Sequence, residues 1–182
     1  MLIRDEVLEI RAVDEAGVEE IFGVYIECED FLALGPVATA SLEMIRADLE
    51  MSKIMGGEFC GIYLRDGTLV GVLDFVPGNF RGQPDTAYIA LLMLRLSFRR
   101  RGLGARVLEL VEAEVRKDPR ISRIRIGVMV NNPSAIQFWQ NRGFILYGGP
   151  ELLADKTTVY RLEKKFPEAG AAPESPAMME RE

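Results

Sequence analysis

The sequence predicts a single domain of the α/β class. Segments in which apolar residues alternate, as in a strand, are interspersed with segments in which they recur every three or four positions, as in a helix. The chain has 182 residues, of which 48% are hydrophobic, and a domain near this size buries about 70% of its unfolded surface. One hydrophobic core therefore suffices to hold the chain without disulfide bonds or a structural metal.

The first third of the chain is expected to contain a strand followed by two helices. Residues 7–13 favour a strand, and in residues 18–25 the apolar side chains recur at the i, i+3, i+4, i+7 spacing of a helix with one buried face. Residues 27–38 combine acids with a Gly-Pro breaker, which indicates a loop. A second helical pattern follows at residues 42–49.

A hairpin and a central strand are predicted in the middle of the chain. Residues 59–65 and 68–77 are rich in β-forming side chains and flank Asp66-Gly67, a dipeptide that tolerates the positive φ of a tight turn. Residues 87–96 form a long apolar segment, which is typical of a strand covered on both faces. We therefore expect an antiparallel hairpin next to a buried strand.

The second half of the chain again alternates helices and strands. Residues 102–117 have the apolar spacing of a helix that ends before Pro119, and residues 124–130 alternate as a strand. After a further helix, residues 144–147 and 157–162 are expected to form the final strands.

The domain is expected to span residues 1–166. From residue 167 to 182 the chain is rich in Pro, Ala and Glu and has almost no large apolar side chains. Such a segment cannot offset the entropy lost on ordering. We therefore predict a disordered C-terminal tail.

Composition argues against several classes of protein. The chain has no histidine, and Cys28 and Cys60 lie in unrelated contexts, so the ligands of a zinc site and a histidine-assisted nucleophile are missing and no metal is expected. The N-terminal residues lack the pattern of a secretory signal, and no apolar run approaches the ~20 residues of a membrane span. We therefore predict a cytoplasmic protein with no membrane partner, and a net charge of -6 argues against nucleic-acid binding.

A candidate phosphate-binding turn lies between the predicted central strand and the helix that follows it. Free N–H groups in the first turn of a helix attract anions, and glycines let a diphosphate approach the backbone closely. The spacing fits neither a P-loop nor a dinucleotide-binding turn. A solvated run of arginines with a tight turn is the alternative interpretation. The residues of this turn are Arg99, Arg100, Arg101, Gly102, Leu103 and Gly104.

A second motif follows the next predicted strand. Asn132 and Pro133 are expected to begin a helix, because Asn caps free N–H groups and Pro suits the first helical position, and Gly143 supplies a left-handed closing residue. The full motif reads Asn132-Pro133-Ser134-Ala135-Ile136-Gln137-Phe138-Trp139, with Gly143-Phe144 behind it. In these two motifs and their order, residues 7–165 resemble the GNAT superfamily of acyl-CoA N-acyltransferases.

The resemblance implies a mixed, mostly antiparallel central sheet with splayed central strands and helices on both faces. It also implies acetyl-CoA as cofactor, with the pantetheine arm lying between the splayed strands and the pyrophosphate on the phosphate-binding turn. Asn132 would contact the pantetheine or only cap its helix. The residues assigned to the cofactor by this resemblance are Leu92, Met93, Leu94, Arg99, Arg100, Arg101, Gly102, Leu103, Gly104, Ala105, Asn132, Phe138 and Trp139.

The catalytic groups are only partly implied by the resemblance. The backbone N–H of Leu94 is the natural donor for the developing oxyanion. The family's usual tyrosine acid is replaced by Trp139, whose indole cannot usefully give up its proton, and Tyr147 or Tyr88 could substitute for it or serve as ordinary strand aromatics. Asp74 is a possible base, since a carboxylate in an interior strand must reach water or a partner. Water could also carry the proton.

The acceptor is expected to be a primary amine of a small molecule or peptide. In the family, acceptor specificity depends largely on the segment between the first two helices and on the last hairpin, here residues 148–155. Acids beside an aromatic would suit a cationic amine, although a solvated loop explains them equally well; these residues are Glu27, Glu29, Asp30 and Phe31. An acetyltransferase acting on protein N-termini or lysines, and a non-catalytic acyl-CoA sensor, remain alternatives. The family also suggests a homodimer.

Overall fold

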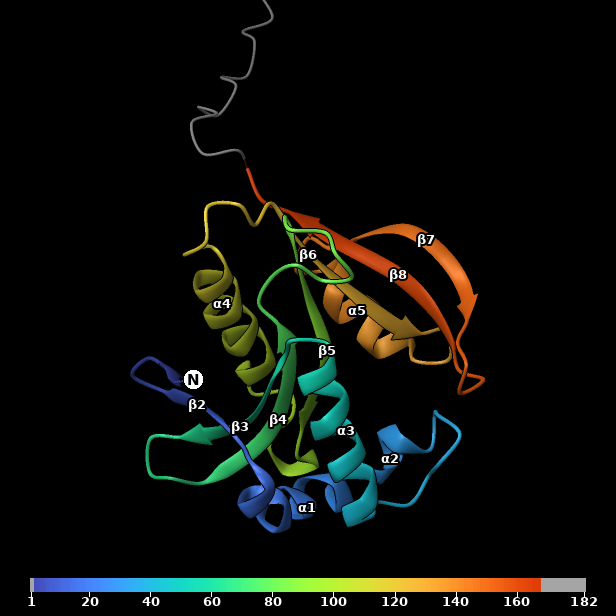
Figure 1. Cartoon of the computed structure of the whole chain (residues 1–182). Coiled ribbons are helices and arrows are strands. Elements are labelled where there is room, and N and C mark those ends of the chain that lie inside the picture. The colour runs from blue at the N-terminus through green and yellow to red at the C-terminus, as the bar shows by residue number, and fades with distance from the viewer. Residues whose placement is uncertain (1, 168–182) are drawn as a thin grey trace, which may run out of the picture.

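The computed structural model describes residues 2–167 as one eight-stranded sheet with helices packed around it (Figure 1). The strands lie in the order β1-β2-β3-β4-β5-β6-β8-β7. Their bounds are β1 Leu2–Arg4, β2 Leu8–Ala12, β3 Glu58–Leu64, β4 Leu69–Val76, β5 Thr86–Leu94, β6 Arg123–Met129, β7 Ile145–Leu152 and β8 Thr158–Lys165. The helices are α1 Val18–Glu27, α2 Glu29–Leu32, α3 Leu42–Ile54, α4 Leu103–Val115 and α5 Pro133–Gln140.

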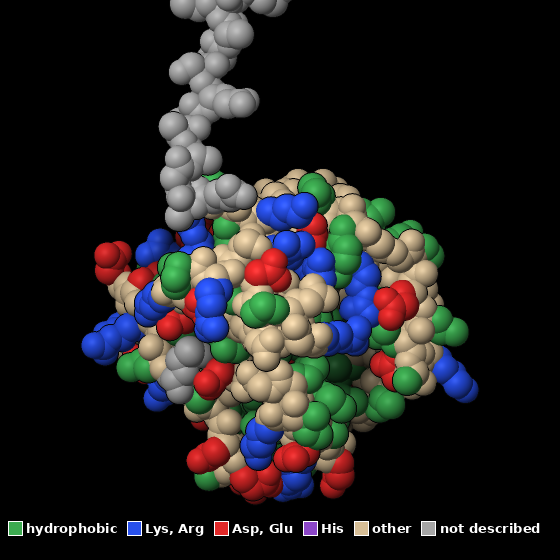
Figure 2. All heavy atoms as spheres, turned by 45° about the horizontal axis from the view of Figure 1, so that its top comes forward, with side chains coloured by type: hydrophobic (Ala, Val, Ile, Leu, Met, Phe, Trp, Pro, Cys, Tyr) green, Lys and Arg blue, Asp and Glu red, His purple; other side chains and the backbone are tan. Residues whose placement is uncertain are grey.

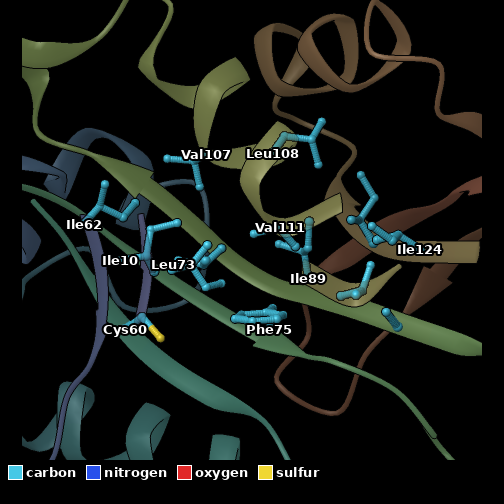
Figure 3. Packing of buried hydrophobic residues seen from close by; sticks show 14 of the residues in the cluster. Ile10, Cys60, Ile62, Leu73, Phe75, Ile89, Val107, Leu108, Val111 and Ile124 are labelled. Carbon is cyan, nitrogen blue, oxygen red and sulfur yellow. The ribbon is translucent and has the colours of Figure 1, made fainter. Parts of the chain in front are cut away.

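Two hydrophobic clusters cover the two faces of the sheet. On one face, Ile21 and Val24 of α1 and Ile45 of α3 pack with Val72 of β4 and Met93 of β5. On the other face the side chains of α4 pack on the sheet (Figure 3); the labelled members of this cluster are Ile10, Cys60, Ile62, Leu73, Phe75, Ile89, Val107, Leu108, Val111 and Ile124. Alternate residues of β4 and β5 thus point to opposite helical layers, as the pleat of a strand requires.

The predicted mixed, mostly antiparallel sheet is confirmed. Among the described strands, β5 and β6 form the one parallel pair, and their register runs only from Thr86↔Arg123 to Ile89↔Ile126. Beyond it, residues 91–94 pair with β4 alone and residues 127–129 with β8 alone. The two central strands therefore separate toward their C-terminal ends.

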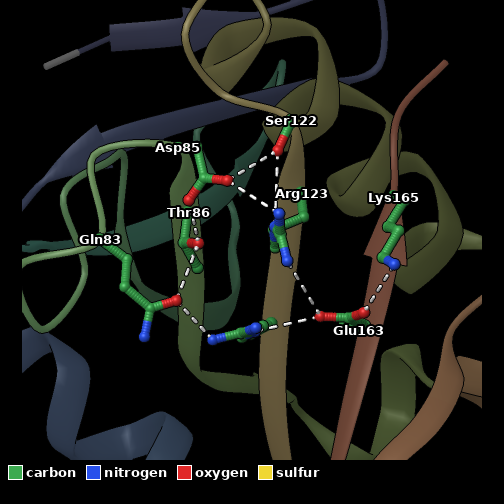
Figure 4. Close-up of polar contacts among 8 residues, drawn as sticks. Gln83, Asp85, Thr86, Ser122, Arg123, Glu163 and Lys165 are labelled. Carbon is green, nitrogen blue, oxygen red and sulfur yellow. Dashed lines mark hydrogen bonds and ion pairs between the residues drawn. The ribbon is translucent and has the colours of Figure 1, made fainter. Parts of the chain in front are cut away.

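Polar contacts hold the closed end of this strand pair (Figure 4). Arg123 at the start of β6 donates to Asp85 over 2.8 Å. Arg125 donates to the buried Glu163 of β8 over 3.1 Å and to Gln83 over 2.7 Å. Charge-assisted hydrogen bonds of this kind fix β5, β6 and β8 at one end, so the opening between β5 and β6 lies at the other.

The structure differs from the sequence-based expectations in a few elements. The expected loop at residues 27–38 contains the short helix α2, and a strand not expected, β1, pairs with β2. The strand expected to extend to residue 96 ends at Leu94, because Leu96–Phe98 form a 3₁₀ turn. Of the predicted tail, residues 168–182 lie outside the described residues. No helix of residues 2–167 is long and apolar enough to cross a membrane.

Candidate active site

A groove of about 1080 Å³ opens where β5 and β6 separate. The C-terminal end of β5, the first turn of α4 and helix α5 supply its walls. The groove therefore lies between the two motifs that the sequence analysis singled out. Its lining includes Leu92, Met93, Leu94, Arg99, Arg100, Gly102, Leu103, Gly104, Ala105, Asn132, Phe138 and Trp139.

The first turn of α4 forms one end of the groove. Gly102 precedes the helix in the left-handed conformation, with φ of 80°, and no side chain caps the helix. The first helical hydrogen bond runs from Arg106 N to Gly102 O over 3.1 Å, so the N–H groups of residues 103–105 precede the helical ladder. A Cβ on Gly104 would lie 3.5 Å from Phe138 and 3.7 Å from Leu94. Glycine here keeps the groove open beside free N–H groups, which fits a diphosphate.

The three arginines of the turn have different surroundings. Arg99 donates from Nε to the carbonyl oxygen of Leu94 over 2.8 Å and from Nη2 to Asp30 over 2.9 Å. The guanidinium of Arg101 lies 5.2 Å from the ring centroid of Phe98. Arg100 lines the groove and is exposed. The guanidinium of Arg99 is therefore held by contacts within the protein. The guanidinium of Arg100 is more exposed to solvent.

The backbone of Leu94 points into the opening between the strands. The N–H of Arg95 donates to the carbonyl oxygen of Val70 in β4 over 2.9 Å. Consecutive residues of a strand direct their backbone N–H and C=O groups to opposite edges, so those of Leu94 point away from β4. The carbonyl of Leu94 accepts from Arg99 and, at 3.3 Å, from Cys28 Sγ. Its N–H lies on that same edge of the strand, which faces away from β4.

A second cavity of about 410 Å³ lies on the side of α1, α2 and α3. Its walls also include the opened parts of β5 and β6 and the β7–β8 hairpin. Hydrophobic side chains form much of its lining, and Figure 2 shows a hollow bordered by such side chains. The groove and this cavity share the lining residues Phe31, Leu92, Met93, Asn132, Ala135 and Trp139. The two spaces therefore meet in the gap between β5 and β6.

The family of the chain follows from a comparison with protein-family models. The model described as the acetyltransferase (GNAT) family matches residues 25–144. The chain belongs to the GNAT acetyltransferase family. Since the matched residues include the groove, its turn and α5, the protein is an acetyl-CoA-dependent acyltransferase, as the sequence analysis predicted. No curated protein sequence matches this acetyltransferase.

Solved structures share the fold of this GNAT acetyltransferase. An acetyltransferase from Thermus thermophilus is 24% identical, with a TM-score of 0.74 over 91% of this chain and 100% of that chain. The Salmonella typhimurium acetyltransferase that modifies the N-terminal serine of ribosomal protein L7/L12 is 21% identical, with a TM-score of 0.73 over 92% and 100%. Spermidine N-acetyltransferase from Vibrio cholerae is 12% identical, with a TM-score of 0.65 over 87% and 95%.

Two of the predicted catalytic residues of the acetyltransferase line neither space. Asp74 is 4% exposed and accepts a 2.6 Å hydrogen bond from Ser52 Oγ. Burial raises the pKa of Asp74 to about 6, against the opposing effect of this hydrogen bond. Tyr147 lies on β7, 41% exposed, under the guanidinium of Arg125. Tyr88 does line the second cavity and stacks on Phe80 at 4.0 Å.

Two residues of the Asn motif in the GNAT domain have clear packing roles. Asn132 Oδ1 accepts from Ala135 N over 3.1 Å, so it caps α5 and also lines both spaces. Trp139 makes edge-to-face contacts with Phe138 and Phe144, each with ring centroids 5.0 Å apart. Trp139 thus joins the hydrophobic core while its surface reaches the junction of the two spaces.

The acids predicted to bind the acceptor each have a partner within the acetyltransferase. Glu27 pairs with Arg95 at 3.1 Å, Glu29 accepts from Ala40 N at 2.9 Å, and Asp30 pairs with Arg99. The partners of these acids thus lie within the protein itself, and of the four predicted residues Phe31 lines both spaces.

Sequence reasoning missed several charged or polar residues of the site. Arg142 and Asn141 line the groove, and Asp48 and Arg161 line the second cavity. Asp155 also lines this cavity, but it belongs to the last hairpin, which the family resemblance already implied for acceptor specificity. One signal was available for Asp48. It lies three residues after Ile45 on the apolar face of α3, where an acid is unexpected. The other residues are brought together by the fold and had no local signal.

Proposed function

We propose that this acetyltransferase transfers an acetyl group from acetyl-CoA to a primary amine by direct attack. The observation that supports this proposal is the junction of the two spaces between β5 and β6. A donor in the groove and an acceptor in the second cavity would approach each other there from opposite sides of the sheet. When bound, acetyl-CoA supplies the thioester carbon that the amine attacks.

The first turn of α4 would hold the diphosphate of the donor. Its N–H groups are free, and the helix dipole adds about half a positive charge at this end. Arg100 and Arg142 line the same groove and add positive charge. The space around Gly102 is open, and Gly104 has no Cβ to fill the gap beside Phe138 and Leu94, so phosphate oxygens can reach the backbone.

The N–H of Leu94 would stabilise negative charge on the carbonyl oxygen under attack. The Leu94 carbonyl is held by Arg99 and Cys28, so the neighbouring N–H is oriented before the reaction begins. A donor fixed in this way needs no reorganisation when charge develops.

Proton transfers would depend on water more than on the predicted acid and base. Trp139 lacks a transferable proton, and Tyr147 and Asp74 line neither space. A thiol has a pKa near ~8.5, so its anion is a tolerable leaving group at neutral pH. Tyr88 is the nearest of the proposed substitutes to the acceptor, since it lines the second cavity.

The size of the second cavity favours a small acceptor. Its volume of about 410 Å³ is within the range of ~300–1,000 Å³ typical of small-molecule sites. The experiment that tests the proposal is incubation with acetyl-CoA and pooled small amines, amino acids and short peptides, followed by mass spectrometry of the products.

The expected result is an acetylated small amine whose formation requires both the protein and acetyl-CoA. Release of free thiol without an acetylated amine would indicate thioester hydrolysis and would contradict the proposal. Acetylation of peptides alone would contradict the preference for a small acceptor.

A further inference from the structure

The charged side chains that line the second cavity differ in how they are paired. Asp155 accepts hydrogen bonds from the backbone N–H and the hydroxyl of Thr157, at 2.9 and 2.6 Å, within the β7–β8 turn. Arg161 donates to Glu151 over 2.7 Å. Asp48 is the remaining charged residue of the lining. Asp155 and Arg161 thus have polar partners within the β7–β8 hairpin.

Asp48 has a neutral partner. Tyr25 Oη donates to Asp48 Oδ2 over 2.6 Å, and no ion pair reaches Asp48 within residues 2–167. Burial raises the pKa of Asp48. The pKa of the nearby Asp74 is raised first by burial and further by the charge of Asp48. Two carboxylates therefore share one region of the protein without a counter-ion, which is costly unless a ligand supplies one.

Asp48 lies away from the junction of the two spaces. It lines the second cavity only, whereas the shared residues, such as Met93 and Trp139, mark the place where the acyl group would be attacked. Many of the other side chains that line the second cavity are apolar, with Leu32, Val37 and Met44 among them. A ligand that reaches both places needs an amine at one end, an apolar middle and a positive charge at the other end.

We propose that Asp48, oriented by Tyr25, is a specificity-determining residue that binds a second cationic group of the acceptor. The acceptor class is then an aliphatic amine that carries a second ammonium group. This inference rests on the proposed function for the position of the reacting amine. The position of Asp48 requires the second ammonium to lie at the end remote from the acetyl group.

The test compares diamines of increasing length with monoamines of the same carbon number, for example cadaverine with pentylamine. The wild-type protein is expected to show at least a roughly tenfold higher kcat/KM for the best diamine than for its matched monoamine, since a charge-assisted contact is lost with the monoamine. Asp48→Asn keeps the shape and the acceptor atom for Tyr25 but removes the charge. It is expected to raise KM for the diamine by about tenfold, to change kcat little, and to abolish the preference.

A matched control is available on the same helix. Glu50 is exposed and pairs with Lys53 at 3.7 Å, so Glu50→Gln removes the same charge from the surface of α3 and should keep the diamine preference. Tyr25→Phe should weaken the preference less than Asp48→Asn, because the charge remains. An equal diamine preference in Asp48→Asn and wild type, or no preference in the wild type, would overturn the inference.

Binding separates this inference from the proposed function. Titration of the same diamine into the protein with saturating coenzyme A, followed by calorimetry, reports the Asp48 contact without turnover. If no amine is acetylated but Asp48→Asn still weakens diamine binding about tenfold relative to Glu50→Gln, the proposed function fails and the inference stands. If amines are acetylated and the variants bind and react alike, the inference fails and the function stands.

Discussion

The guanidinium of Arg99 donates a 2.8 Å hydrogen bond to the carbonyl oxygen of Leu94, the last residue of β5. The same side chain pairs with Asp30, and the same carbonyl accepts from Cys28 Sγ. One arginine therefore joins the end of the central strand, the turn before α4 and helix α2. The proposed oxyanion donor at Leu94 owes its orientation to one contact from nearby in the sequence, Arg99, and to one from a distant segment, Cys28.

Removal of Arg99 is expected to affect both stability and turnover. Arg99→Ala deletes the contacts to Leu94 and Asp30, and hydrogen bonds to charged groups contribute about 1.5–3 kcal/mol each, less where they are exposed. We expect the free energy of unfolding to fall by about 1–2 kcal/mol in chemical denaturation and kcat to fall about tenfold or more. Arg101→Ala, at the exposed end of the same turn, should change stability by less than about 0.5 kcal/mol. Similar losses in the two variants would contradict the role of Arg99.

A larger residue at Gly104 is expected to abolish coenzyme A binding. The Cβ of Gly104→Glu would point at Phe138 and Leu94 inside the groove, and its carboxylate would repel phosphate. Calorimetric titration with coenzyme A should show affinity reduced at least about a hundredfold. Ala113→Glu adds the same charge to an exposed position of α4 and should bind normally. Normal binding by Gly104→Glu would refute the assignment of the groove.

Asp74 is expected to make stability depend on pH. Burial raises its pKa to about 6 from the ordinary value of 3.8, so folding favours the protonated form. The stability that the protonated Asp74 contributes is fully present below about pH 4 and is lost as pH rises through about 6. A pKa shift of this size corresponds to a change of about 2–3 kcal/mol in the free energy of unfolding.

The comparison of wild type with Asp74→Asn isolates this effect from other titrating groups. Asparagine can still accept the hydrogen bond of Ser52 but does not ionise. In denaturation series from pH 4 to pH 8, the free energy of unfolding of the variant should equal that of the wild type at pH 4 and exceed it by about 2 kcal/mol at pH 8. A constant difference across the range would show that the carboxyl group does not titrate as described.

Trp139 is expected to contribute packing more than proton transfer. Trp139→Phe keeps an aromatic side chain against Phe138 and Phe144, so kcat should stay within about threefold of wild type, since the indole has no proton to give. The lost volume should lower the free energy of unfolding by about 1–2 kcal/mol. Steady-state kinetics and denaturation test the two parts separately, and a hundredfold loss of kcat in a folded variant would assign Trp139 a catalytic role.

Local signals account for the elements that the sequence predicted well. The expected helices at residues 102–117 and from Asn132 onward appear as α4 and α5, with Asn132 at the cap and Gly143 at a φ of 86°. Caps and left-handed glycines depend on a few neighbouring residues, so a short stretch of sequence contains the information. The glycine turn before α4 was recognisable for the same reason, and the family match confirms the acetyltransferase that it indicated.

Longer-range contacts explain where the sequence interpretation was incomplete. The acids at residues 27–30 resembled an acceptor site, but they pair with Arg95, Arg99 and the backbone of Ala40. Asp74 was expected to reach either water or a partner, and the structure shows Ser52 of α3 as its partner. In each case the partner lies at least ten residues away in the sequence, so a local sequence pattern could not predict the contact.

The sequence by itself determined the class of the protein, the glycine turn before α4 and the cap of α5, because these depend on backbone conformation set by adjacent residues. Only the tertiary structure decided which charges remain unpaired. Asp48 and Tyr25 are 23 residues apart, and their shared position beside the second cavity arises when α1 and α3 pack on the same face of the sheet. Burial and pairing decide whether a charge is available to a ligand, and both are properties of the packed chain.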